Sequence, residues 1–253
     1  MHDVAGAPPL RLGIFGRGRL GRAIADAAGR QVVWQVGRDE APRGGVDVVV
    51  DASKGPAVPG HLDWALHTGC DLVIGATGFD LPDLHRRVGQ TIGVLVAPNF
   101  SLTVALVARL TRVLGAYAAR EPRFDPFVLE HHRADKHDAP SGTARLLAET
   151  LLGACPRKRR WRLTDGSGPL LADELSVGAL RAGSTYSSHV IGLDAPEETL
   201  ELRHEARSPA AFAAGCLRAC AWLRGRKGVF GMDDVARAML DPLFSNPDQD
   251  ART

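Results

Sequence analysis

The densest group of chemically active side chains lies in one segment, residues 130–143, which reads EHHRADKHDAPSGT. It combines three histidines with a lysine, an arginine and acidic residues. Its end precedes the apolar positions Leu146, Leu147 and Leu151 and is typical of a helix N-terminus. The free N–H groups and positive dipole end of such a helix suit a carboxylate. The segment therefore predicts an imidazole, a basic group and an anion cradle side by side.

Two other interpretations of this segment are open. Three histidines with acids could ligate a metal, but the segment lacks the HxxxH and HExxH patterns, and Lys136 in its middle would repel a cation. We therefore expect no metal. The second alternative is a solvated polar loop without a function.

A glycine pattern near the N-terminus points to a nucleotide. Gly16, Gly18 and Gly21, with Arg19 and Leu20 between them, follow an apolar run at 12–15 and precede a helical pattern at 22–28. Glycines at this spacing let the backbone approach a pyrophosphate that the helix N-terminus holds. The spacing therefore predicts a dinucleotide site.

The choice of nucleotide depends on the residues about twenty positions further on. An acid there binds the adenosine 2′-hydroxyl of NADH, but the chain reads Gly37-Arg38-Asp39. Arg38 suits the 2′-phosphate of NADPH, and Arg17, Arg19 and Arg22 add positive charge. NADPH is the predicted cofactor, and Asp39 keeps NADH possible.

Three more segments follow apolar runs that we expect to be strands. Ligands of an open α/β sheet bind at the carboxyl ends of its strands, so these segments predict further cofactor contacts, although each could be an ordinary turn. The candidate residues are Asp51 and Ser53, Gly75 and Thr77, and Ala97, Asn99 and Phe100.

The elements that position these residues change character at Phe100. Apolar runs at 12–15, 32–36, 46–50, 72–74 and 92–96 alternate with helical stretches at 60–68 and 81–88, which predicts a doubly wound parallel sheet. Next come an expected helix at 102–114, a strand at 127–130 and a helix from 141 to 152. Expected strands at 174–181, 185–193 and 200–206 predict a second, mostly antiparallel sheet. A helix at 210–224 should pack back on the first part, and the basic run 157–160 should be a solvated loop.

Composition limits the function classes. The 253 residues are 45% hydrophobic and 24% charged, which does not fit a disordered or a membrane protein. Net charge is 31 − 29 = +2, too balanced for a dedicated nucleic-acid binder. The four cysteines form no CxxC pair and are expected to be buried thiols. The first residues resemble no signal peptide, and no apolar run reaches about 18 residues, so a cytoplasmic location is expected.

Seven motifs in order resemble the dihydrodipicolinate reductase family over most of the chain, from Leu12 to about Val235. They are GRGRLG, GATGF, APNFSL, EHHRADKHDAPSGTA, RAGSTYSSHVIGLDAPEETLELRHEA, FAAGCLRACAWL and KGVFGMDDV. The stretch HHRADKHDAPSGTA is the specific one, whereas the glycine turn is shared with many families.

The resemblance implies an α/β fold with a Rossmann-type dinucleotide-binding domain at 1–101 and a substrate-binding α+β domain at 102–209. The C-terminal part, 210–253, would return as a helix to the first domain, and the second domain would make a homotetramer. The implied activity is NAD(P)H-dependent reduction of 4-hydroxy-tetrahydrodipicolinate, a small dicarboxylate of lysine and diaminopimelate biosynthesis. No nucleic-acid or membrane partner is expected.

The resemblance also implies residue roles. His132 would donate a proton, Lys136 would anchor or help protonate the intermediate, and Ser141, Gly142 and Thr143 would cradle a carboxylate. The glycine-turn, GATGF and APNF segments would hold the dinucleotide. Which of His131 and His132 donates the proton stays open, as does whether His189 and His204 face the site.

Two departures from the family pattern bear on the substrate. Arg133 replaces the second histidine of a His-His pair, and Pro209 replaces an arginine. A dicarboxylate needs a second cationic partner, for which we expect Arg133 or Arg207. The alternatives are a reductase of the same fold that acts on another small imino or oxo acid, and a cofactor-binding protein without turnover.

Overall fold

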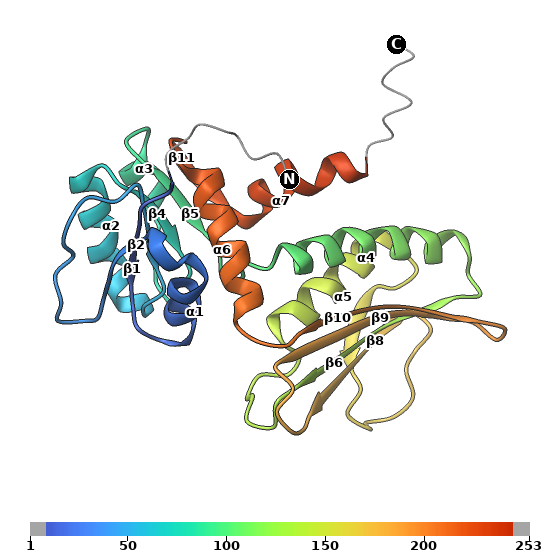
Figure 1. Ribbon diagram of the computed structural model, residues 1–253. Coiled ribbons are helices and arrows are strands. Elements are labelled where there is room, and N and C mark those ends of the chain that lie inside the picture. The colour runs from blue at the N-terminus through green and yellow to red at the C-terminus, as the bar shows by residue number, and fades with distance from the viewer. Residues whose placement is uncertain (1–8, 245–253) are drawn as a thin grey trace, which may run out of the picture. The chain divides into compact units, whose positions relative to one another are not determined.

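The computed structural model describes residues 9–244 (Figure 1). These residues form two compact units. The first unit contains the chain up to Ser101 and again from Pro209, and the second contains Leu102–Ser208. Each unit is described by itself.

The first unit is built on a six-stranded sheet with the order β11-β5-β4-β3-β1-β2. Every neighbouring pair runs parallel. The central strands are almost continuously apolar because both faces of the sheet are covered. The strands are β1 (Leu12–Phe15), β2 (Val32–Val36), β3 (Val48–Asp51), β4 (Asp71–Ile74), β5 (Gly93–Val96) and β11 (Gly228–Gly231).

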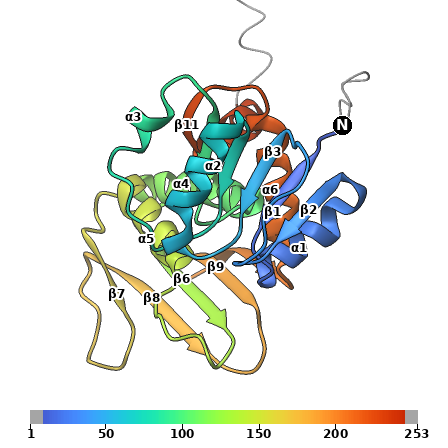
Figure 2. The ribbon, with the colours of Figure 1, turned by 90° about the vertical axis from the view of Figure 1, so that its left-hand side faces the viewer.

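Helices cover both faces of this sheet (Figures 1 and 2). On one face α2 packs Leu62 and Ala65 against Leu72 and Ile74. On the other face α1 and α6 pack against each other, and α6 also contacts β4 and β5. The helices are α1 (Arg19–Ala28), α2 (Val58–Thr68), α3 (Leu84–Val88), α6 (Ala210–Leu223) and α7 (Met232–Leu240). Short 3₁₀ turns lie at Gly29–Gln31, Gly55–Ala57 and Asp241–Leu243.

The predicted doubly wound parallel sheet is confirmed. The edge strand β11 and the helix α7 were not predicted. β11 is short and begins and ends in glycine, so it produces no clear pattern. α7 does carry apolar residues at helical spacing, at Met232, Val235, Ala236 and Leu240, and this signal was overlooked.

The second unit is built on a five-stranded sheet with the order β10-β9-β6-β8-β7. Its elements are α4 (Leu102–Arg120), β6 (Asp125–His132), α5 (Gly142–Ala154), β7 (Arg160–Leu163), β8 (Glu174–Arg181), β9 (Ser187–Asp194) and β10 (Thr199–Ala206). The pairs β10–β9 and β9–β6 are antiparallel, whereas β6–β8 and β8–β7 are parallel. The expectation of a mostly antiparallel sheet is therefore corrected to a mixed sheet.

The correction has a topological cause. The alternation of polar and apolar residues shows which face of a strand is buried but not the direction in which the strand runs. After β6 the chain crosses over through α5, and such a crossover delivers strands parallel to the first. The basic run 157–160 was also misread as a solvated loop, because Lys158 is buried and Arg160 begins β7.

Both helices of the second unit lie on one face of its sheet (Figure 1). The core between these helices and the sheet contains Val128, Leu147, Val177 and Ile191. The opposite face carries no helix of this unit. There Leu129 and Leu180 are 44% and 55% exposed.

One helix among the described residues, α4, is long and apolar enough to cross a membrane by length and composition alone. It packs against α5, and its Val107 is buried in the core of the second unit. These contacts are those of a structural helix of the unit.

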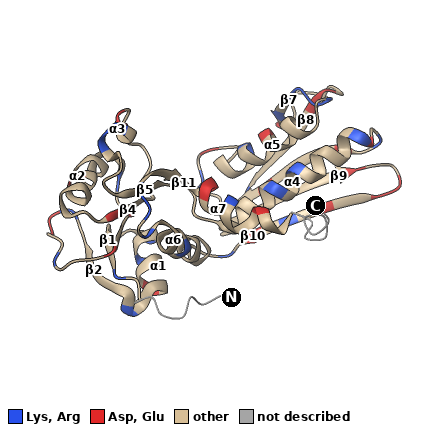
Figure 3. Ribbon diagram, turned by 90° about the horizontal axis from the view of Figure 1, so that it is seen from above, with Lys and Arg blue, Asp and Glu red and all other residues tan. Residues whose placement is uncertain are grey.

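Charged residues of both signs are interspersed in each unit (Figure 3). The small net charge of the chain therefore does not arise from one strongly basic unit balanced by an acidic one.

Asp71 at the start of β4 makes one of the contacts that hold the returning C-terminal segment in the first unit. Asp71 is 5% exposed, and its two carboxylate oxygens accept the N–H groups of Gly93 at 2.8 Å and Gly225 at 2.9 Å. One acid thus joins β5 to the turn that follows α6.

We expect Asp71→Ala to lower the free energy of unfolding by about 2–4 kcal/mol, because two backbone donors lose a charged acceptor. Asp71→Asn keeps one amide oxygen and should cost less. Urea denaturation followed by circular dichroism measures both. A loss below about 0.5 kcal/mol in Asp71→Ala would show that the contact is dispensable.

Candidate active site

The site in the second unit begins with the alternation of β6. Val128, Glu130 and His132 occupy successive positions on the face that packs against the helices, and all three are buried. The same face is apolar around Val128 and becomes polar toward the carboxyl end of the strand. A charged residue on the buried face of a strand requires partners.

Glu130 has partners from three other elements. Its carboxylate accepts the backbone N–H of Ser141 at 3.0 and 3.2 Å and a guanidinium N–H of Arg181 at 2.7 Å. His189 of β9 lies with Nε2 3.7 Å from Oε2. Glu130 therefore links β6 to the start of α5, to β8 and to β9.

These contacts determine the charge of Glu130. Burial by itself would raise the pKa of this carboxyl group, but its polar contacts with His189, Ser141 and Arg181 outweigh it. The pKa of Glu130 is held well below its usual range, so the group is a carboxylate at neutral pH.

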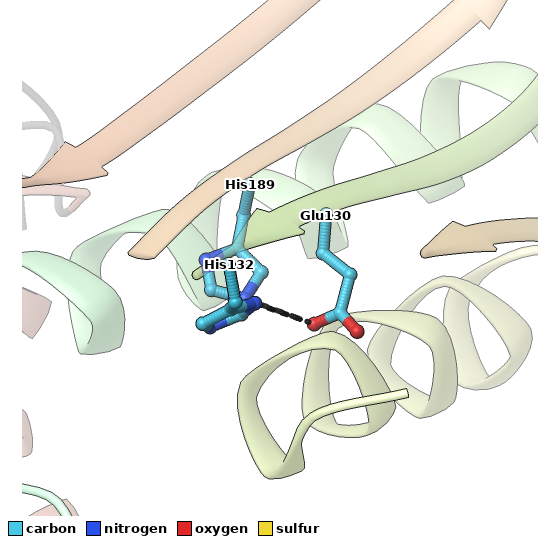
Figure 4. Close-up of side chains that lie close together, drawn as sticks. All are labelled: Glu130, His132 and His189. Atoms are coloured by element: carbon cyan, nitrogen blue, oxygen red, sulfur yellow. Dashed lines mark ion pairs between the residues drawn. The ribbon is translucent and has the colours of Figure 1, made fainter. Parts of the chain in front are cut away.

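His132 is the buried histidine next to this carboxylate (Figure 4). Its Nδ1 lies 3.4 Å from Oε2 of Glu130 and makes no hydrogen bond. Its ring meets that of His189 edge to face, with 5.2 Å between the ring centroids. Burial lowers the pKa of His132 to about 4; the Glu130 carboxylate opposes this shift, and His189, Lys136 and Arg181 add to it. The imidazole is therefore neutral at pH 7 before any ligand binds.

The strand register answers the open question about His189 and His204. Glu130 pairs with His189, and His189 pairs with His204, so the three form one row across β6, β9 and β10. Burial, and then the charge of His189, lowers the pKa of His204. His189 is 1% exposed and belongs to the site, and His204 lies beside it on the edge strand.

The loop after β6 brings Lys136 toward the site and holds the other polar residues in different contacts. Lys136 Nζ donates to Asp138 at 2.7 Å, and Arg181 also donates to the backbone carbonyl of Asp138 at 2.6 Å. Arg133 pairs with Asp135 at 2.5 Å. His131 lies on the opposite face of β6, with Nε2 2.9 Å from the Ala182 carbonyl. Of the two candidate histidines, only His132 lies beside Glu130.

The predicted helix N-terminus is confirmed at Ser141. Its hydroxyl accepts the N–H of Ala144 at 3.1 Å as the cap of α5 and lies 3.2 Å from His189 Nε2. Both the N–H and the hydroxyl of Ser141 thus have partners within the protein. Gly142 and Thr143 stand in the first helical turn, where N–H groups have no carbonyl within the helix to bind.

Glu130, His132 and His189 place one ligand atom each within 4.8 Å of one another, as a metal would require. Their surroundings favour an anion instead. The Arg181 guanidinium and the Ser141 N–H already bind the carboxylate, and Lys136 and the positive end of α5 lie nearby.

The glycine turn of the first unit fits a phosphate. Gly16 has φ +107°, and a Cβ there would lie 2.5 Å from the Ala52 carbonyl oxygen, so only glycine is tolerated. Gly18 caps α1 without a side-chain hydrogen bond and has open space around it. An added Cβ at Gly21 would lie 2.3 Å from the Gly16 oxygen. The turn therefore presents the free N-terminus of α1, which begins at Arg19 and Leu20.

The other predicted cofactor residues all follow carboxyl ends of strands in this unit. Gly75 and Phe100 touch, since a Cβ on Gly75 would lie 2.7 Å from the Phe100 ring. Phe100 and Ala97 are buried, Thr77 is exposed, and Asn99 caps the N–H of Ser101 at 2.9 Å. Arg38 is exposed just beyond β2.

Asp51 differs from its neighbours at this edge. It is fully buried, its Oδ1 accepts the N–H of Ser53 at 3.0 Å, and its Oδ2 lies 2.7 Å from His61 Nδ1. The His61 ring stacks on Phe15 with 3.8 Å between centroids. Asp51 therefore orients Ser53 and α2, and it has little freedom to contact a ligand.

Sequence reasoning missed Glu130, Arg181 and His61 as members of these sites. Glu130 and His132 share the buried period-two face of β6, which was the available signal. Arg181 lies 51 residues from Glu130 and needs the sheet register to reach it. His61 resembles any polar position of a helix.

Comparison with known sequence families gives two adjoining matches. "Dihydrodipicolinate reductase, C-terminus" matches residues 101–236, and "Dihydrodipicolinate reductase, N-terminus" matches residues 37–100. The first match includes Glu130, His132, Arg181 and His189.

Individual relatives extend the similarity to most of the chain. The 4-hydroxy-tetrahydrodipicolinate reductase of Gluconobacter oxydans (strain 621H) is 34% identical over 90% of this chain and 97% of its own. That of Aquifex aeolicus (strain VF5) is 35% identical over 75% of this chain and 72% of its own. The dipicolinate-bound dihydrodipicolinate reductase of Paenisporosarcina sp. TG-14 has the same fold, with a TM-score of 0.70, 20% identity and coverage of 88% and 98%.

The lowered pKa of His132 predicts how stability changes with pH. Between pH 6.5 and about 4 the unfolded chain binds a proton at His132 that the folded chain excludes. The free energy of unfolding should therefore fall as the pH falls, by about 1.6 kcal/mol between pH 6.5 and 5 from this residue. Urea denaturation across that window measures the slope, and His132→Gln should flatten it.

His137→Gln, an exposed substitution in the same loop, controls for loss of a histidine as such. An unchanged slope in His132→Gln would contradict the assignment of this proton to His132.

Proposed function

The chain belongs to the dihydrodipicolinate reductase family, and we infer that it reduces 4-hydroxy-tetrahydrodipicolinate with a pyridine nucleotide in lysine and diaminopimelate biosynthesis. It is an NAD(P)H-dependent oxidoreductase. The 4-hydroxyl leaves with a ring hydrogen as water, and reduction adds a hydride and a proton to the ring. The observation that carries the assignment is the family match over the segment that places His132 beside Glu130.

The first unit fits the coenzyme. Gly16 and Gly21 leave no room for a side chain against the backbone, and Gly18 opens the N-terminus of α1 to a phosphate. When bound, the coenzyme supplies the hydride. Further contacts are proposed for Arg19, Leu20, Ser53, Gly75, Thr77, Ala97, Asn99 and Phe100, with Asp51 acting through Ser53.

The second unit supplies the proton and the anion site. His132 is proposed as the proton donor. It is neutral in the free protein because burial lowers its pKa to about 4, and a dicarboxylate bound beside it would favour the imidazolium form. The N–H groups of Gly142 and Thr143 at the start of α5 receive one carboxylate, and Ser141 holds that turn in place.

Lys136 is proposed to bind the substrate by exchanging partners. Its ammonium group is held by Asp138 at 2.7 Å and is partly buried. A substrate carboxylate would take the place of Asp138. Arg133 and Arg207 remain the proposed partners of the second carboxylate. Arg133 would have to break its ion pair with Asp135 to bind this carboxylate.

Glu130 is proposed as a positioning residue. It fixes the first turn of α5 through Ser141 and the loop through Arg181, which also holds the Asp138 carbonyl. Without its charge, the anion cradle and the Lys136 loop would lose their common anchor.

Several finer points are proposals too. NADPH is proposed over NADH because Arg38 stands beyond β2, where a guanidinium can bind a 2′-phosphate. We also propose that the protein is cytoplasmic, that the first unit binds the coenzyme and that the second unit binds the substrate. A homotetramer is proposed through the helix-free face of the second sheet, whose exposed Leu129 and Leu180 need cover.

We expect the protein to consume NADPH when a synthase generates 4-hydroxy-tetrahydrodipicolinate in the same cuvette. His132→Gln should lower kcat by about 100-fold or more, because a positioned acid–base group contributes on that scale. Lys136→Ala should lower kcat/KM by a similar factor, because the substrate carboxylate loses a cationic partner that positions it. NADPH affinity, measured by fluorescence titration, should stay within twofold. His131→Gln is the matched control and should keep most of the activity.

Two results would redirect the assignment. Loss of activity in His131→Gln with little loss in His132→Gln would exchange the roles of the two histidines. Normal NADPH binding without turnover of this substrate would favour a reductase of another small imino or oxo acid, with Arg133 and Pro209 as the residues that changed the site.

We expect wild-type protein to sediment as a tetramer, and Leu180→Glu or Leu129→Glu to shift it to smaller species, because a carboxylate would be buried in the interface. Leu171→Glu is the control, since Leu171 is 58% exposed outside the sheet. A wild-type monomer, or a tetramer unaffected by both sheet substitutions, would refute the proposed interface.

A further inference from the structure

A backbone hydrogen bond joins the glycine turn to the end of β2 in the first unit. The N–H of Gly16 donates to the Val36 carbonyl at 2.8 Å. In a doubly wound sheet these two segments flank the adenosine ribose of a dinucleotide. The charged side chains at this junction therefore meet the group that distinguishes NADPH from NADH.

Glu40 lies at this junction, with its side chain directed back toward Gly37. One oxygen of Glu40, Oε2, accepts both a guanidinium N–H of Arg17 at 2.5 Å and the backbone N–H of Gly37 at 3.1 Å. The same nitrogen of Arg17 also donates to the Gln35 carbonyl at 3.1 Å. Glu40 thus bridges the glycine turn and the end of β2.

The pair is charged and able to open. The Gly37 N–H, and then Arg17, lower the pKa of Glu40, so it is a carboxylate at neutral pH. The side chains of Arg17 and Glu40 are 55% and 48% exposed. Gly37 leaves room for them, since an added Cβ would lie 3.9 Å from Arg17 Nε and 4.0 Å from the Glu40 carboxyl carbon.

We propose that Glu40 is a coenzyme-selecting residue, whose carboxylate occupies the Arg17 guanidinium and the Gly37 N–H that the 2′-phosphate of NADPH would otherwise bind. This inference rests on the proposed use of a pyridine nucleotide. NADPH must open the Arg17–Glu40 pair, whereas NADH leaves it closed and its 2′-hydroxyl can donate to the carboxylate. Glu40 therefore reduces the advantage that Arg38 gives to NADPH.

The size of the effect follows from the exposure of the pair. An exposed ion pair changes an equilibrium constant by up to about fivefold. Repulsion between the 2′-phosphate and a carboxylate a few ångströms away adds about a further twofold at low salt. Together they predict an effect of about 5- to 10-fold on binding of the phosphorylated nucleotide.

The test compares binding of 2′,5′-ADP with 5′-AMP, and of NADPH with NADH, by calorimetry at about 50 mM salt, where screening is weak. Glu40→Gln should tighten 2′,5′-ADP and NADPH about 5- to 10-fold and change 5′-AMP and NADH less than twofold, or weaken NADH. Asp26→Asn is the matched control: it removes the same charge from an exposed residue of α1 that no proposed contact uses. It should change every affinity less than twofold.

A second comparison tests the pairing itself. Arg17→Ala should weaken 2′,5′-ADP more in the Glu40→Gln background than in wild type, because only the released guanidinium reaches the phosphate. Thermal melts of the variants check that each remains folded.

Three results would overturn the proposal. One is a Glu40→Gln protein with an unchanged NADPH-to-NADH ratio, and another is an equal shift in Asp26→Asn, which would reduce the effect to net charge. The third is an Arg17→Ala effect that does not depend on residue 40. Failure of the proposed function would look different, because then wild-type protein would bind neither coenzyme.

Discussion

The polar cluster of the second unit depends on one buried carboxylate. Charge is costly to bury, so Glu130 is tolerated only while Ser141, Arg181 and His189 surround it. Each of these contacts fixes a different element against β6. The start of α5, the end of β8 and the first residues of β9 therefore converge on one point. His132, two residues further along β6, takes its place and its lowered pKa from the same convergence.

Much of this arrangement could be predicted from the sequence, because its chemistry is concentrated in 14 consecutive residues. The segment predicted a helix N-terminus, and Ser141 caps α5 as expected. The sequence did not separate His131 from His132; the strand alternation did, by placing them on opposite faces of the sheet. Arg181 and His189 could not be assigned because their roles depend on strand register. Strand direction was equally hidden, so the second sheet proved mixed rather than mostly antiparallel.

The first unit was easier to predict because parallel strands bring their carboxyl ends to one edge whatever the details of each turn. The apolar runs gave the strands, and the glycine turn lies where the spacing placed it. Side-chain direction at that edge was not predictable. Asp51 points inward to His61, and Glu40 turns back through a three-residue bend to reach Gly37. This edge of the sheet therefore carries two acids in quite different settings: Asp51 is buried beside His61, and Glu40 is exposed and paired with Arg17.

The first unit is assembled from both ends of the described chain, with β11 pairing along β5 and Asp71 holding the turn after α6. The second unit, by contrast, is one continuous stretch. On the ribosome, β5 emerges more than 100 residues before the strand that covers its edge. The second unit can therefore complete its sheet while the first still has an open edge strand, the kind of surface that invites aggregation and chaperone binding. Synthesis of the first unit thus begins before that of the second, but its sheet can be completed only after the sheet of the second.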